Sequence, residues 1–213
     1  ENHRVVVFEL PGFGASAAND RSENIQALAG TMNAALAALK IAECSVMGNS
    51  FGARVVLWMA LLDATRFDCV VLVAPAAIPF QATQPPPTDE RSRLYAHPEK
   101  QPPEPEVPAE VREQQQQFLK RMRDTSPPEE LVNRLGEIEL PVLALFGTKD
   151  RVSPTTAAHL YAESLPDCSL MLVYDAAHAI DADRPEAVSS IVADFVERKG
   201  EFLVTRETGV IDP

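Results

Sequence analysis

The chain has 213 residues, of which 46% are apolar, so it can bury the core of one ordinary domain with length left for an insertion. Its formal net charge is −12. This acidic balance excludes tight nucleic-acid binding, which requires many cationic contacts to phosphates, and it disfavours docking on anionic lipid. No stretch approaches the roughly 20 apolar residues of a membrane span.

The three cysteines, Cys44, Cys69 and Cys168, are widely separated and lie in or beside apolar runs. No pair has metal-ligand or redox-motif spacing, so we expect small buried thiols in a reducing compartment. These features favour a cytoplasmic protein. The sequence begins at Glu1 and not at Met, which leaves secretion open. Nothing in the pattern decides whether the protein forms a homo-oligomer.

Strand and helix patterns alternate along the first third of the chain. Short β-branched or apolar runs predict strands over 5–9, 44–47 and 69–73, the first ending at a Pro-Gly loop. Apolar residues at three- and four-residue steps predict an amphipathic helix over 23–40, and an almost wholly apolar segment predicts a buried helix over 55–62. Met47 and Trp58 have core spacing, and we expect both to pack inside.

The composition changes after residue 78. Ten of the 18 prolines lie between Pro85 and Pro128, yet helical signals persist. Pro108 is placed to open a helix through Leu119 and Met122, and Ser126 is placed to cap the helix that follows it. We therefore predict that residues 79–138 form a small, mostly helical insertion.

The regular alternation resumes beyond the insertion. Apolar runs predict strands over 141–146 and 170–174, and helical patterns follow over 154–164 and 188–196. Strands that alternate with helices are typical of a parallel sheet covered on both faces. The predicted fold class is α/β, with a mostly parallel sheet flanked by helices.

Residues 48–52 read GNSFG and lie between a predicted strand and a predicted helix. A serine hydroxyl attacks a carbonyl only if it stands clear of the backbone and a base takes its proton. A sharp strand-to-helix turn exposes Ser50 in this way, and we expect Gly48 and Gly52 to provide the space for that turn. The turn also places Ser50 at a helix N-terminus, which favours developing negative charge.

Asp150 and His178 each follow the end of a later predicted strand. Because the carboxyl ends of parallel strands meet at one edge of the sheet, we expect both side chains to lie near Ser50. Ser50 is then the nucleophile, His178 the base and Asp150 the acid that orients the base. Such chemistry requires no metal and no organic cofactor.

The sequence resembles the α/β-hydrolase family from residues 11–16 (PGFGAS) to the last helix. The elbow of that family matches 48–52, its Gly-x-x-Asp turn matches 147–150 (GTKD), and its base matches His178, with 184–186 (RPE) opening the last helix. The resemblance implies a core formed by 1–78 and 139–213, with 79–138 as a helical cap that shapes the substrate pocket.

Other side chains offer weaker candidates. Asp150 could merely cap the next helix, but Ser153 is the better local residue for that role. His3, His97 and His159 are expected to be structural or solvated, and His97 is the first of them to consider for substrate contact because it lies in the insertion.

One departure from the family concerns its N-terminal strands. The sequence starts just before the fourth strand of the family, so we expect the first strands to be missing and the chain to be a fragment of a longer enzyme. The Phe51 backbone N–H would supply one oxyanion-hole donor, while the second donor would be missing, at a cost of about 3–4 kcal/mol. Residues 5–9 must then pair with 44–48 or leave backbone groups unpaired.

The leading interpretation is a serine hydrolase that cleaves a carboxylic ester or related acyl bond of a small, largely apolar molecule. A second is a carbon–carbon bond hydrolase of the kind that acts on aromatic ring-cleavage products, for which Arg54 could bind a substrate carboxylate if it points inward. A third, of another class, is a non-catalytic binding module on a hydrolase scaffold.

Overall fold

The computed structural model describes residues 3–17, 21–79, 89–103 and 107–199. The strands are β1 Cys44–Asn49, β2 Phe67–Val73, β3 Val142–Gly147 and β4 Cys168–Val173. The α-helices are α1 Ile25–Ala38, α2 Phe51–Leu62, α3 Glu90–Leu94, α4 Ala109–Thr125, α5 Pro128–Val132, α6 Thr155–Ser164, α7 Ile180–Asp183 and α8 Pro185–Arg198. Three short 3-10 helices, η1 Ala64–Arg66, η2 Pro98–Lys100 and η3 Leu135–Glu137, lie between them.

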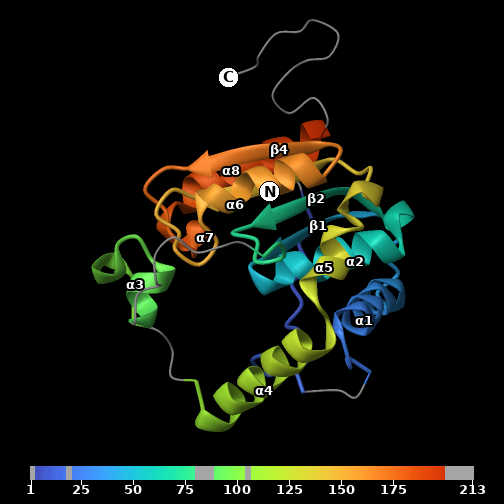
Figure 1. Ribbon diagram of the computed structural model, residues 1–213, viewed down its shortest axis with the longest axis horizontal. Coiled ribbons are helices and arrows are strands. Elements are labelled where there is room, and N and C mark those ends of the chain that lie inside the picture. Colours follow the sequence, from blue (N-terminus) through green and yellow to red (C-terminus); the bar gives the residue numbers. More distant parts are fainter. Residues whose placement is uncertain (1–2, 18–20, 80–88, 104–106, 200–213) are drawn as a thin grey trace, which may run out of the picture.

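The four strands form one parallel sheet in the order β1-β2-β3-β4 (Figure 1). Successive residues of β2 point to opposite faces, so Val70 and Leu72 enter one apolar core while Val71 and Val73 enter the other. Helices α1, α2 and α6 contribute to the first core, and α7 and α8 to the second. A parallel sheet with helices on both faces confirms the predicted fold class.

The prediction of a strand over residues 5–9 is wrong. These residues adopt no regular structure, and Val5 and Val7 are 78% and 85% exposed. Their β-branched side chains favour an extended backbone, but a strand also requires a neighbour to accept its hydrogen bonds. Among the described residues β1, the expected neighbour, pairs with β2 alone.

The prediction that Met47 packs inside is also wrong, because its side chain is 48% exposed. Met47 stands in register with Val71 and therefore shares the face covered by α8. The described strand residues in the core on that face belong to β2, β3 and β4, and none belongs to β1. Trp58, by contrast, is buried as predicted, with 1% exposure.

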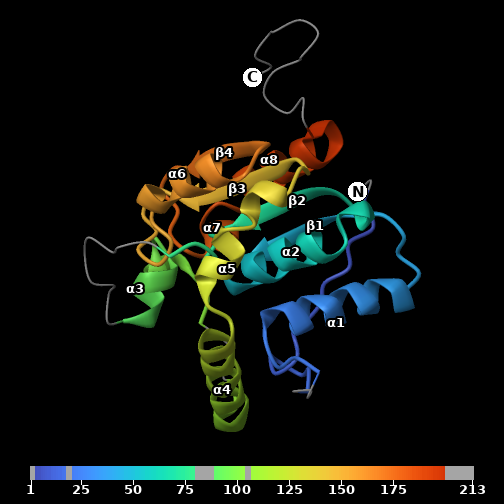
Figure 2. The same cartoon turned by 45° about the vertical axis from the view of Figure 1, so that its right-hand side comes forward.

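The described part of the predicted insertion contains helices α3, α4 and α5, while residues 80–88 and 104–106 lie outside the described residues. Helix α4 lies apart from the sheet (Figures 1 and 2) and buries only Phe118 and Met122. Helix α3 lies instead beside α7, at the end of the sheet where the strands terminate (Figure 2). The insertion therefore contacts the core at two separate places.

Ser126 does not cap α5, whose N-cap residue is Pro127. Its hydroxyl accepts a hydrogen bond from the Ile25 N–H at 2.9 Å, and its carbonyl accepts one from the buried Arg54 guanidinium. Burial lowers the pKa of Arg54, with Glu129 opposing the shift. Ser126 thus joins α1, α2 and the end of α4, a role that no local pattern could reveal.

The segment after β2 is supported by Tyr161 of α6. The phenol oxygen accepts hydrogen bonds from the backbone N–H groups of Ala77 and Ile78 at 2.9 and 3.0 Å, and it donates to the Pro75 carbonyl. Burial raises the pKa of Tyr161 to about 12. This segment also contacts the turn between β1 and α2, because the Ala76 N–H donates to the Ser50 carbonyl at 3.3 Å.

Tyr161→Phe should destabilise the protein by about 2–4 kcal/mol, because two buried N–H groups lose their acceptor. At this chain length the loss corresponds to a fall of roughly 5–15 °C in the thermal unfolding midpoint. Tyr174→Phe removes the same hydroxyl from a side chain that is 81% exposed and serves as the control. Equal midpoints for the two variants would show that the Tyr161 bonds contribute nothing.

Candidate active site

Ser50 lies in the turn that joins β1 to α2. Its backbone has φ +50° and ψ −112°, a conformation that costs an L-residue energy and that is typical of a nucleophile elbow. The turn is held by a hydrogen bond of 2.9 Å from the Ser50 N–H to the Val73 carbonyl of β2. The hydroxyl is consequently presented at the carboxyl end of the sheet.

The two glycines around Ser50 do not play equal parts. A Cβ atom on Gly48 would lie 2.3 Å from the Gly52 carbonyl oxygen, which no real side chain tolerates. A Cβ atom on Gly52 would meet nothing within 4 Å. The tight turn therefore depends on glycine at position 48, and the expectation that Gly52 also provides space is wrong.

Asp150 follows β3 and is 5% exposed. One oxygen of its carboxylate, Oδ1, accepts hydrogen bonds from the N–H groups of Val152 and Ser153 at 2.7 and 2.9 Å. The other oxygen, Oδ2, lies 2.9 Å from Nδ1 of His178. The following helix α6 has Pro154 as its N-cap and no side-chain cap, so the expectation that Ser153 caps it is wrong, and the buried Ser153 hydroxyl has no described partner. Asp150 instead holds the turn before α6 and contacts the imidazole.

His178 follows β4 and joins the other two side chains. Its Nδ1 faces Asp150, and its Nε2 lies 2.8 Å from the Ser50 hydroxyl oxygen. The imidazole is only 7% exposed. A neutral imidazole that donates from Nδ1 to a carboxylate presents Nε2 as an acceptor, so this arrangement can take a proton from the serine hydroxyl.

Phe51 begins α2, and its N–H is one of the first four in a helix that have no acceptor within the helix. Its ring packs edge-on against Phe118 of α4, which makes the same kind of contact with Phe13. The insertion is therefore attached directly to the residue after Ser50. No local pattern indicates this aromatic cluster, because Phe51 is 67 positions from Phe118 and Phe13 is 105 positions from it.

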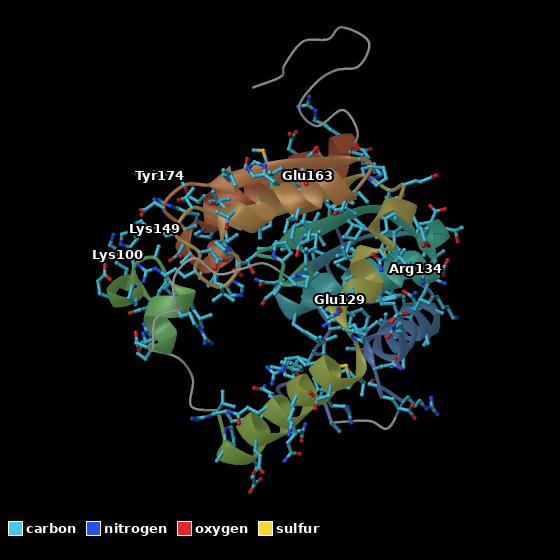
Figure 3. The ribbon with its side chains drawn as sticks, viewed as in Figure 1. Lys100, Glu129, Arg134, Lys149, Glu163 and Tyr174 are labelled. Carbon is cyan, nitrogen blue, oxygen red and sulfur yellow. The ribbon has the colours of Figure 1, made fainter. Side chains whose placement is uncertain are left out.

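A second polar cluster surrounds Asp175 at the same end of the sheet. The carboxylate binds Nε2 of His97 at 2.9 Å, the guanidinium of Arg184 at 2.6 Å and the ammonium of Lys149. Lys149 and His97 hold the pKa of Asp175 well below its usual range. Figure 3 shows Lys149 on the same side of the molecule as Lys100 of the insertion. His97 thus has the structural role expected of it, since it links the insertion to the core.

The other histidines and the cysteines stand apart from this end of the sheet. His3 and His159 are exposed, as expected for solvated side chains. Cys69 is buried and Cys44 and Cys168 are partly buried, all three as free thiols whose pKa is raised by burial. Among the described residues no group of His, Cys, Asp or Glu side chains is arranged to hold a metal ion, and no helix is long and apolar enough to cross a bilayer.

The hydrogen-bonded side chains lie within a match to the model of the alpha/beta hydrolase family that spans residues 1–191. The chain belongs to this family. The sequence resemblance is thereby confirmed, and the protein is an enzyme of the hydrolase class.

Curated relatives of this hydrolase include the pimeloyl-[acyl-carrier protein] methyl ester esterase of Neisseria meningitidis serogroup B. The two are 31% identical over 81 residues. The aligned region covers 38% of this chain and 31% of that esterase, so the match reaches only about a third of the relative's length.

Solved structures similar to this hydrolase include enzymes of two chemical kinds. An esterase from Exiguobacterium antarcticum has a TM-score of 0.63 and 19% identity, with 89% of this chain and 80% of that chain covered. The 2-hydroxy-6-oxo-6-phenylhexa-2,4-dienoate hydrolase of Rhodococcus has a TM-score of 0.66 and 20% identity, with 87% and 77% covered. At these identities the likeness concerns the fold.

Proposed function

We propose that this hydrolase cleaves a carboxylic ester or related acyl bond of a small, largely apolar molecule, with Ser50, His178 and Asp150 as its catalytic triad. The observation that carries the proposal is the continuous chain of hydrogen bonds from the Ser50 hydroxyl through both imidazole nitrogens to the Asp150 carboxylate, at 2.8 and 2.9 Å. Packing alone does not require these three polar side chains to meet in line, two of them almost fully buried.

The reaction follows from this order of groups. Ser50 Oγ attacks the acyl carbon as its proton passes to Nε2 of His178, and the negative charge that forms on the carbonyl oxygen is stabilised by the Phe51 N–H. His178 then protonates the leaving alcohol, which leaves the acyl group on Ser50. A water molecule, deprotonated by His178, releases the acid and restores the serine. Asp150 keeps the proton of the imidazole on Nδ1 throughout.

The substrate class is supported by the esterase among the curated relatives and by the esterase among the similar structures. The insertion 79–138 fits the role of a cap, because α4 packs on Phe51 through Phe118 and α3 lies beside the His178 loop. The free thiols support a reducing compartment such as the cytoplasm.

Carbon–carbon bond cleavage is a weaker candidate. It draws on the Rhodococcus hydrolase, whose likeness is one of fold, and on Arg54 as a group that binds a substrate carboxylate. The Arg54 guanidinium instead donates to the Ser126 carbonyl in a buried position. A non-catalytic binding module is disfavoured by the strained backbone of Ser50, because this strain lowers folding stability and a binding role does not require it.

The proposal is tested with a fluorophosphonate probe, which labels activated serines. We expect the protein to be labelled on the peptide that carries Ser50, and we expect Ser50→Ala to abolish labelling and hydrolysis of p-nitrophenyl butyrate. Ser153→Ala removes a buried serine hydroxyl close to Asp150 and should remain labelled. A folded protein that is never labelled, or that is labelled elsewhere, would count against the assignment.

A further inference from the structure

The loop that carries His178 is held on one side by the insertion and on the other by Asp183 of α7. The Ala179 N–H donates to the Leu94 carbonyl at 2.8 Å. On the other side, the N–H groups of Ala177 and Ala96 both donate to one carboxylate oxygen of Asp183, Oδ2, at 2.8 and 2.9 Å. The residues immediately before and after His178 are therefore both hydrogen-bonded, Ala177 to Asp183 and Ala179 to Leu94. We call this set of contacts, made by Leu94, Ala96 and Asp183, the bracket.

Asp183 is well suited to such a bracket. It ends the short helix α7, directly after the His178 loop, and its side chain is partly buried. A carboxylate that accepts two backbone N–H groups forms charge-assisted hydrogen bonds, which are stronger than neutral ones. Because the same oxygen receives Ala177 of the core and Ala96 of the insertion, Asp183 links the two segments through one acceptor.

The segment of the insertion that meets Asp183 is itself fastened to the core. His97, next to Ala96, binds Asp175, which Arg184 and Lys149 also contact. Gln101 lies 3.4 Å from the second oxygen of Asp183. These polar contacts join residues 94–101 of the insertion to residues 175–183, which follow β4.

We propose that Asp183 is a positioning residue for His178, and that it couples the seating of the insertion segment 94–97 to the orientation of the imidazole. The inference rests on the proposed function, because orientation matters only if His178 transfers a proton. A displacement of about 1 Å at a catalytic group can cost roughly a hundredfold in rate. Displacing the His178 loop should therefore lower kcat and leave KM nearly unchanged.

Two variants separate position from charge. Asp183→Ala removes the shared acceptor and should lower kcat for p-nitrophenyl butyrate about 10- to 100-fold, with KM within about twofold. Asp183→Asn removes the charge but keeps a carbonyl oxygen that can accept both N–H groups, so it should stay within about threefold of the wild type. Asp181→Ala removes an exposed carboxylate from the same short helix and serves as the matched control.

The relative activities of Asp183→Ala and Asp183→Asn test the positioning role. If Ala and Asn at position 183 lose activity equally, or if the acid limb of the kcat/KM profile shifts alike in both, Asp183 acts through its charge and the positioning role is overturned. Wild-type kcat in Asp183→Ala would also overturn it. If Asp183→Ala does not fold, Asp183→Glu retains the charge while displacing the acceptor by one methylene, and a kcat equal to that of the wild type would then reject the proposal.

Amide hydrogen exchange followed by NMR tests the bracket without reference to activity. In Asp183→Ala the amides of Ala96 and Ala177 should exchange faster than in the wild type, while those of β3 remain protected. A protein that is never labelled at Ser50 but shows this change would refute the proposed function and retain the bracket. Unchanged exchange at both amides would refute the bracket, whatever the activity.

Discussion

Asp150→Asn should lower kcat for p-nitrophenyl butyrate about 10⁴-fold in a protein that still folds. The reason lies in the two sides of the Asp150 carboxylate. Its Oδ1 accepts two backbone N–H groups, from Val152 and Ser153, so the asparagine carbonyl oxygen must occupy that side. The asparagine NH₂ group then faces Nδ1 of His178 and donates to it.

A donor at this position imposes the wrong tautomer on the imidazole. Nδ1 must become the acceptor, the ring proton moves to Nε2, and Nε2 can no longer accept the proton of Ser50. Fluorophosphonate labelling should slow in parallel with kcat. The exposed Asp181→Asn is the control, and circular dichroism verifies the fold of both variants. A loss of less than about tenfold would show that Asp150 does not set the tautomer.

Most of the fold and the candidate site follows from local signals. The strands β1 to β4 are short apolar runs, each followed by a turn, and strand-helix alternation implies that their ends share one edge. Ser50, Asp150 and His178 each follow such an end, and the hydrogen bonds between them join residues 28 and 128 positions apart. The edge of a parallel sheet makes this convergence predictable.

The wrong predictions share one cause: a local sequence pattern does not reveal which distant residues pack beside it in the fold. Residues 5–9 have strand propensity but pair with no described strand, and Met47 has core spacing but lies outside the core that α8 covers. Asp150 and Ser153 are both good capping residues by type, yet the N-cap of α6 is Pro154, and Asp150 binds N–H groups of the turn before that helix. The bracket at Asp183 joins positions 87 apart, which no periodicity reveals.

Gly48→Ala should destabilise the protein by about 3 kcal/mol or more and should abolish labelling of Ser50, whereas Gly52→Ala should be neutral or stabilising by up to about 1 kcal/mol. The two glycines flank the same serine, so local composition does not distinguish them. The structure does: the new Cβ meets the Gly52 carbonyl and the Ala53 nitrogen in the first case and open space in the second.

The overlap in Gly48→Ala involves backbone atoms, which cannot rotate away as a side chain can. Relief requires β1 and the first turn of α2 to separate, and this displaces Ser50 from His178. Gly52 lies in helix α2, where alanine loses less conformational entropy than glycine does on folding. Urea unfolding at equilibrium measures both variants on one scale. Equal destabilisation by the two variants would mean that the turn relaxes freely. This result would contradict the rigid turn on which the proposed proton transfer depends.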